Sequence, residues 1–146
     1  AKYTSFDDFG AKVSSVVTKV LPLLETPFFT RVGLRFVNQL PCGTAPKGWL
    51  REALVGDLAE GALGVPREYW HHVRLAAGAN GLLLRHGFQA AAEGPTQYLL
   101  DLDAYAEDVD ATTLADRLRR LDELAYDAFV WSAGPTLISK LKGEAK

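Results

Sequence analysis

The sequence predicts an α+β fold, a two-layer sandwich in which helices cover one face of a mostly antiparallel sheet of about four strands. Apolar residues recur with helical spacing near both ends of the chain, and alternating apolar and polar residues mark strands between them. Short turn signals connect consecutive strands, which makes these neighbours antiparallel. Three amphipathic helices can cover only one face of such a sheet. The predicted order is α-β-α-β-β-β-α.

A first helix is predicted to begin after Ser5, whose hydroxyl can accept a hydrogen bond from a free amide of the first turn. Asp8, three residues later, can bond back to the cap residue. Pro22 lacks an amide proton and should kink or end this helix. The apolar stripe expected to face the core consists of Phe6, Phe9, Val13, Val16, Val17, Val20, Leu21 and Leu24.

The first strand is expected over residues 31–40, with alternate residues on opposite faces. Val32, Leu34, Phe36 and Leu40 form its apolar face, which Asn38 interrupts as a hydrogen-bonded amide or a strand end. A short helix is expected from about residue 48 to residue 60, before the helix breakers Gly61, Gly64 and Pro66.

Three strands of a meander are predicted next, over residues 69–77, 82–90 and 97–105. Asn80-Gly81 is predicted to be the two-residue turn of the first hairpin, which pairs Ala77 with Leu84. The final helix is expected to open between Asp110 and Thr113 and to be interrupted at Gly134-Pro135. Its buried stripe is predicted to be Leu114, Leu118, Leu121, Leu124, Ala125, Ala128 and Phe129.

Length and charge exclude several classes of protein. The 146 residues suit a single domain, residues 1–146, and no apolar run approaches the roughly 20 residues that span a bilayer. A net charge of −2 and a pI of about 5.9 disfavour nucleic-acid binding. The one cysteine, Cys42, cannot form an internal disulfide, and the first residues do not resemble an intact signal peptide, so a cytoplasmic location is expected. Because methionine is absent, residue 1 is not expected to be the start of translation.

Three segments together resemble a sporadically distributed family of uncharacterised prokaryotic proteins. They are residues 31–38 (RVGLRFVN), residues 98–105 (YLLDLDAY) and the closing helix with Leu121, Phe129 and Ser132. The family has an R-x-G-L-R-[FY]-x-N strand, then an L-x-D-x-D strand and a helical C-terminus. Gln39 departs from the family, in which a basic residue is common. The resemblance implies that this chain is the C-terminal part of a longer protein, and it implies no activity.

The strand pattern predicts an exposed polar face on the sheet. The predicted register places the carboxylates of the L-x-D-x-D strand on this face together with basic residues of the neighbouring strands. The candidate binding residues are Arg31, Arg35, His72, Arg74, Arg85, Asp101 and Asp103. Two interpretations stay open. The face can be solvated and crossed by ion pairs, or it can dock the absent N-terminal part of the protein, a second subunit or an anionic ligand.

No catalytic residue, metal site or cofactor is predicted. His71 and His72 point to opposite faces of a strand, so they cannot bind one metal ion together. Nearby arginines should keep Asp101 and Asp103 ionised, which is unsuited to a general acid. Cys42 is expected to be an inert thiol.

Four further side chains carry an expectation about their place in the fold. His86 is expected at the core edge, hydrogen-bonded to backbone. Trp49 and Trp131 are predicted to lie in the core and Trp70 to be exposed at an interface.

The leading functional hypothesis is therefore a non-enzymatic binding or assembly module, whose partner is another protein or a second copy in a homodimer. The alternative is a small-molecule-processing enzyme with a site between this domain and a preceding segment, using Arg35, Asp101, Asp103 and His72.

Overall fold

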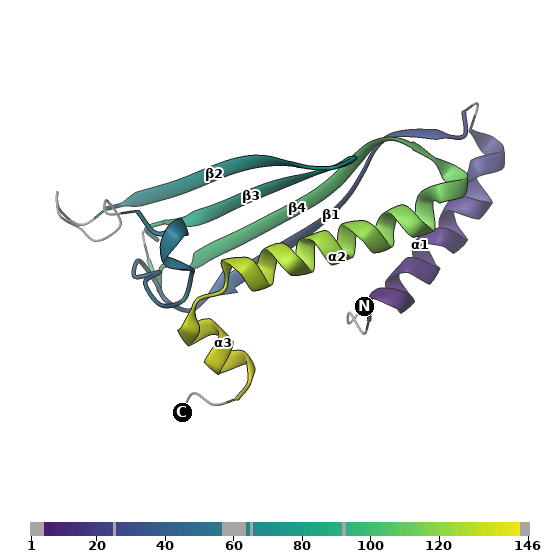
Figure 1. Ribbon diagram of the computed structural model, residues 1–146. Coiled ribbons are helices and arrows are strands. Elements are labelled where there is room, and N and C mark those ends of the chain that lie inside the picture. The colour runs from purple at the N-terminus through teal and green to yellow at the C-terminus, as the bar shows by residue number, and fades with distance from the viewer. Residues whose placement is uncertain (1–4, 25, 57–63, 65, 92, 144–146) are drawn as a thin grey trace.

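The structure is a computed structural model that describes residues 5–24, 26–56, 64, 66–91 and 93–143 (Figure 1). It confirms the predicted α+β class, with one four-stranded antiparallel sheet in the order β1-β4-β3-β2. No helix in the described residues is long and apolar enough to cross a membrane. The strands are β1 (Phe28–Leu40), β2 (Glu68–Ala77), β3 (Asn80–Gln89) and β4 (Tyr98–Asp110), and the α-helices are α1 (Phe6–Val20), α2 (Leu114–Ser132) and α3 (Pro135–Leu141).

The core lies between α2 and the face of the sheet that this helix contacts, as Figure 1 shows. Leu118, Leu121 and Ala125 of α2 are buried against strand residues such as Leu100 and Leu102. The side chain of Asp110 accepts a hydrogen bond from the amide of Thr112, which starts a 3₁₀ turn, Ala111–Thr113, before α2. In the part of the chain that the structure describes, no helix lies across the opposite face of the sheet, and we call it the open face (Figure 1).

Helix α1 begins as predicted, because the hydroxyl of Ser5 accepts a hydrogen bond from the amide of Asp8 at 3.1 Å. The helix ends at Val20, and the segment containing Pro22 forms a 3₁₀ turn, Leu21–Leu23, which confirms the predicted end of the α-helix. The prediction that its apolar stripe is buried is wrong, since no residue of α1 is buried and Val16 is 60% exposed. Among the described elements outside its own end, α1 contacts α2 most extensively. Phe6, Val13 and Val17 pack against the core as partly buried side chains, and the rest of the stripe is more exposed.

The segment predicted as a short helix over residues 48–60 contains a 3₁₀ turn, Glu52–Leu54. Leu50 and Leu54 are buried, so this segment packs one end of the core. Residues 57–60 lie outside the described part of the chain.

The predicted register of the β2–β3 hairpin is wrong by four positions. Ala77 pairs with Asn80 rather than with Leu84, so the two turn residues are Gly78 and Ala79. Gly78 has a φ of 62°, which suits the first central position of a type II′ turn. Moving the turn by two residues leaves every side chain on its predicted face, because side chains alternate with a period of two.

The predicted core position of Trp131 is also wrong. Its side chain is 45% exposed, and the guanidinium of Arg51 lies 5.2 Å from the centre of its ring. Trp49 packs against the core as a partly buried side chain.

Candidate functional site on the open face of the sheet

The register of the sheet sets the open-face residues in rows that cross all four strands. One row contains Val37, Asp101, Arg85 and His72, from β1, β4, β3 and β2 in turn. The adjacent row contains Arg35, Asp103, Leu83 and Arg74. Arg31 lies farther along β1, opposite Glu107. All seven candidate residues therefore lie on the open face.

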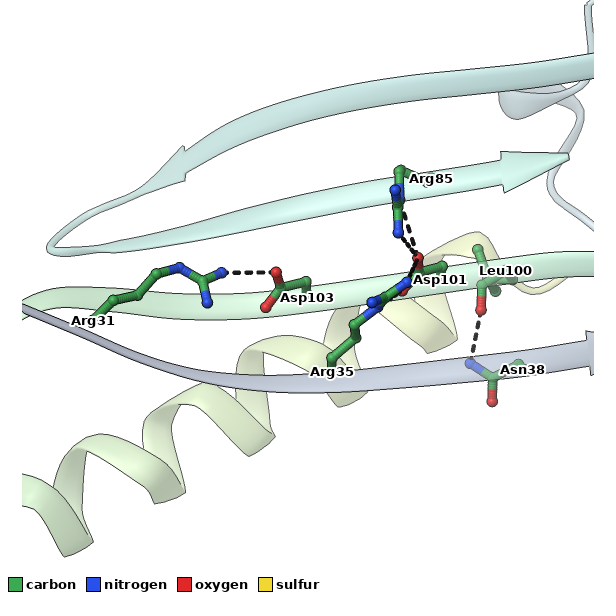
Figure 2. Close-up of polar contacts among 7 residues, drawn as sticks. All are labelled: Arg31, Arg35, Asn38, Arg85, Leu100, Asp101 and Asp103. Carbon is green, nitrogen blue, oxygen red and sulfur yellow. Dashed lines mark hydrogen bonds and ion pairs between the residues drawn. The ribbon is translucent and has the colours of Figure 1, made fainter.

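Asp101 is the centre of this face, although its side chain is almost out of contact with solvent. The residue is 5% exposed, and its carboxylate accepts two hydrogen bonds from Arg35, from Nε and Nη2, each at 2.8 Å (Figure 2). Arg85, which faces Asp101 across β3 and β4, donates to the same carboxylate from Nε at 3.0 Å and from Nη2. Two guanidinium groups from different strands thus hold one carboxylate, and the pair with Arg35 has the bidentate geometry that makes such hydrogen bonds strong.

These contacts decide the charge of Asp101. Burial alone would raise the pKa of the carboxyl, but the hydrogen bonds from Arg35 and Arg85 outweigh it, and the pKa is lowered. The carboxylate is therefore ionised at neutral pH, and the arginines use its acceptor positions. This chemistry suits a structural anchor for the arginines and is unsuited to a general acid.

A second ion pair joins Asp103, in the row next to that of Asp101, to Arg31 farther along β1. Arg31 Nη2 donates to Asp103 at 2.7 Å, and the guanidinium of Arg31 lies 4.7 Å from the centre of the Tyr105 ring (Figure 2). Arg74 and His72 make no ion pair in the described residues and are exposed. Two strand spacings separate His72 from Asp101, about 10 Å, with Arg85 between them. The four residues of the enzyme hypothesis are therefore not gathered at one point.

Glycines shape the open face in a way that the sequence pattern did not indicate. A Cβ atom at Gly81 would overlap the ring of Tyr105, and one at Gly87 would lie 2.8 Å from Cε3 of Trp70. A Cβ atom at Gly33 would lie 3.0 Å from Nη1 of Arg31. Each glycine thus lets a large side chain from a neighbouring position lie down against the sheet. The result is a low surface, on which Trp70 is 45% exposed.

A buried polar chain lies on the other face of the sheet. His86 is fully buried, with Nδ1 2.7 Å from the hydroxyl of Tyr98 and Nε2 3.0 Å from Nδ1 of His71. Burial, together with His71, lowers the pKa of His86 to about 4, so the ring is neutral at pH 7. The expected hydrogen bond to backbone is replaced by these side-chain bonds. Sequence reasoning missed the chain because it depends on the register that pairs His71 with His86.

Cys42 and the described acidic and histidine residues offer little further chemistry. Burial raises the pKa of the Cys42 thiol to about 11, so the reactive thiolate form is scarce at neutral pH. Among the described residues, no group of three or more His, Cys, Asp or Glu side chains is arranged to hold a metal ion.

Comparison of the chain with protein-family models, curated proteins and solved structures finds no match. The resemblance based on residues 31–38 and 98–105 stays a prediction.

Proposed function

We propose that the chain is a non-enzymatic binding and assembly module that docks a protein partner through the open face. The observation that carries this proposal is the buried carboxylate of Asp101 held between two arginines on a sheet face without a covering helix. A second, more exposed ion pair between Arg31 and Asp103 extends the charged surface along the same face.

The geometry favours docking because the arginines are fixed and still accessible. The side chains of Arg35 and Arg85 are 55% and 38% exposed, so their remaining N–H groups can reach a partner. A guanidinium that is already held in place loses less side-chain freedom on binding, which lowers the entropic cost of association. Covering this cluster of charges with another layer of the same chain would cost desolvation energy. The cluster instead lies on the open face, where a partner can reach it, which supports a role in recognition.

The apolar part of the open face supports the same function. Trp70 and Val37 are 45% and 52% exposed, and the glycines keep the surface low. Tryptophan and arginine are the residues most enriched at the energetic centres of interfaces. A low face of this kind can receive another sheet, since two sheets pack face to face about 10 Å apart.

A second copy of the chain is the partner to test first, because the open face carries both arginines and carboxylates and can complement its own charges. We expect light scattering of the 15.9 kDa chain at rising concentration to give the mass of a dimer. Arg35→Ala and Trp70→Ala should each weaken the dimer at least tenfold, since each removes a central contact. The matched controls are Arg119→Ala, which removes an exposed arginine of α2, and Leu23→Asp, which changes the helical layer.

Docking of a different protein, rather than a second copy of this chain, requires a second measurement. Phenylglyoxal labels accessible arginines, and Arg35 and Arg85 should be protected in cell extract relative to the purified chain, while Arg119 should not. A monomer at all concentrations combined with no protection of these arginines would reject the proposed function. If Leu23→Asp is the only variant that abolishes the dimer, the dimer interface lies on the helices and not on the open face.

A further inference from the structure

A hollow on the helix side of the sheet has a composition that suits a ligand. It measures about 280 Å³ and lies between β1 and α2, on the side of the sheet opposite to the open face. Its apolar walls are formed by Phe36, Leu102, Ala125 and Phe129. This volume is just below the range of about 300–1,000 Å³ that is typical of small-molecule pockets, so it suits a small ligand. The hollow is separate from the face to which the assembly function is assigned.

The wall contributed by α2 carries a carboxylate without a partner. Asp122 lines the hollow and makes no hydrogen bond or ion pair with the described residues. Burial raises the pKa of this carboxyl, and the charges of Glu123 and Asp7 raise it further. The groups that surround Asp122 therefore make the local potential negative, which favours a cation near it.

The wall contributed by β1 carries a second hydrogen-bond acceptor. Asn38 Nδ2 donates to the carbonyl of Leu100 at 3.2 Å, which fixes the orientation of the amide (Figure 2). Its Oδ1 points away from that carbonyl and accepts no hydrogen bond from the described residues. The hydroxyl of Tyr126, at the same hollow, can either donate or accept. Acceptors thus predominate among the polar side chains, so a matching ligand must donate hydrogen bonds.

The aromatic walls favour the same class of ligand. Phe36 and Phe129 present two rings to the hollow, and the face of an aromatic ring attracts a cation. We propose that the hollow binds a small organic cation, a primary ammonium group on an apolar stem. The ammonium group binds Asp122 and Oδ1 of Asn38, and the stem packs between Phe36, Leu102 and Phe129.

The test is a titration followed by NMR amide shifts, with 2-phenylethylamine as the probe at pH 7 and low salt. We expect saturable shifts confined to the residues around 36–38 and 122–129, with a Kd of roughly 10⁻⁴ to 10⁻³ M. The neutral analogue 2-phenylethanol should bind at least fivefold more weakly, because it lacks the charge. The anion 3-phenylpropionate should not bind.

Matched variants assign the binding to this hollow. Asp122→Asn should weaken binding of the amine about tenfold, because a hydrogen-bonded ion pair is lost. Glu123→Gln removes a neighbouring exposed charge that contributes to the negative potential but does not line the hollow, so it should change the Kd less than threefold. Ala125→Phe should fill the hollow and abolish binding. If Ala125→Phe does not fold, the comparison of Asp122→Asn with Glu123→Gln decides alone.

Three outcomes would overturn the proposal: no saturable shift, equal binding of the amine and the alcohol, or equal effects of Asp122→Asn and Glu123→Gln. None of these outcomes depends on the open face. Loss of amine binding in a chain that still assembles through Arg35 would therefore refute only the ligand site.

Discussion

Two buried ionisable groups show how this sheet accommodates polar side chains. Asp101 keeps its charge because Arg35 and Arg85 donate hydrogen bonds to it. His86 has no carboxylate among its hydrogen-bond partners in the described residues, and burial lowers its pKa, so its ring is neutral between Tyr98 and His71. The ion pairs of Asp101 leave charged arginines on the surface. The buried neutral ring of His86 makes the stability of the folded state sensitive to acid.

The stability of the protein should fall as the pH drops from about 6.5 to about 4. The pKa of His86 is about 4 in the folded chain, and the pKa of an unfolded histidine is about 6.5. The unfolded state therefore binds the proton first, and stability that is complete above pH 6.5 is lost by up to about 3 kcal/mol at pH 4. Urea unfolding at several pH values measures this slope.

His86→Gln should flatten the slope, whatever its stability at pH 7. The control is His72→Gln, because His72 is exposed on the open face and should leave the slope unchanged. An equal slope in wild type and His86→Gln would contradict the assignment.

At the residue scale, the sequence predicts the face of a side chain better than its partner. Alternation along β4 placed Asp101 and Asp103 opposite to the core. It could not show that Asp101 is buried, because the two arginines that cover it come from β1 and β3. Likewise, the bond between His86 and Tyr98 requires the pairing of β3 with β4, which no local pattern contains.

At the element scale, the β2–β3 hairpin shows that packing within the sheet can override a strong local turn preference. Asn80-Gly81 is the preferred turn sequence, but both residues lie in β3. Gly81 is needed within the strand because Tyr105 lies over it, and the turn forms at Gly78-Ala79 instead. Because the displacement is two residues, the prediction of the open face survived an incorrect register.

Substitution of a glycine by alanine should have opposite effects on stability in a strand and in a helix of this protein. Gly87→Ala should destabilise the protein by at least about 2 kcal/mol, since its Cβ would collide with the backbone of Tyr69 and Trp70. Gly10→Ala should stabilise it by about 0.5–1 kcal/mol, because Gly10 lies inside α1 with nothing within 4 Å of the added atom. Thermal unfolding of both variants tests the pair, and a neutral Gly87→Ala would contradict the close approach of β2.

At the scale of the whole molecule, the layers differ in how firmly they are held. β4 lies between β1 and β3 and contacts α2, whereas α1 buries no residue completely. The fold class followed from periodicity and turn signals. The sequence could not show that the apolar stripe of α1 is only partly covered, because an amphipathic pattern indicates which face is apolar and not how completely that face is buried.

Hydrogen exchange should reveal this difference directly. Amides of β4 should exchange only by global unfolding, while amides of α1 exchange through local opening at least about 100-fold faster. Mass spectrometry of peptides from residues 6–20 and 98–110 measures the ratio. Equal protection of both segments would show that α1 is as firmly docked as the sheet.

The strand order has a consequence for the emergence of the chain from the ribosome. Among the four described strands β1 is made first, yet it pairs in the sheet with β4, which is made last. Residue 40 can pair only after residue 98 has been synthesised, and residue 28 only after residue 110. The β2–β3 hairpin, in contrast, can pair as soon as both strands are made, starting from Ala77 and Asn80 beside the turn. The first strand made is therefore the last to be paired, and its backbone needs protection from premature contacts throughout the synthesis of the other three.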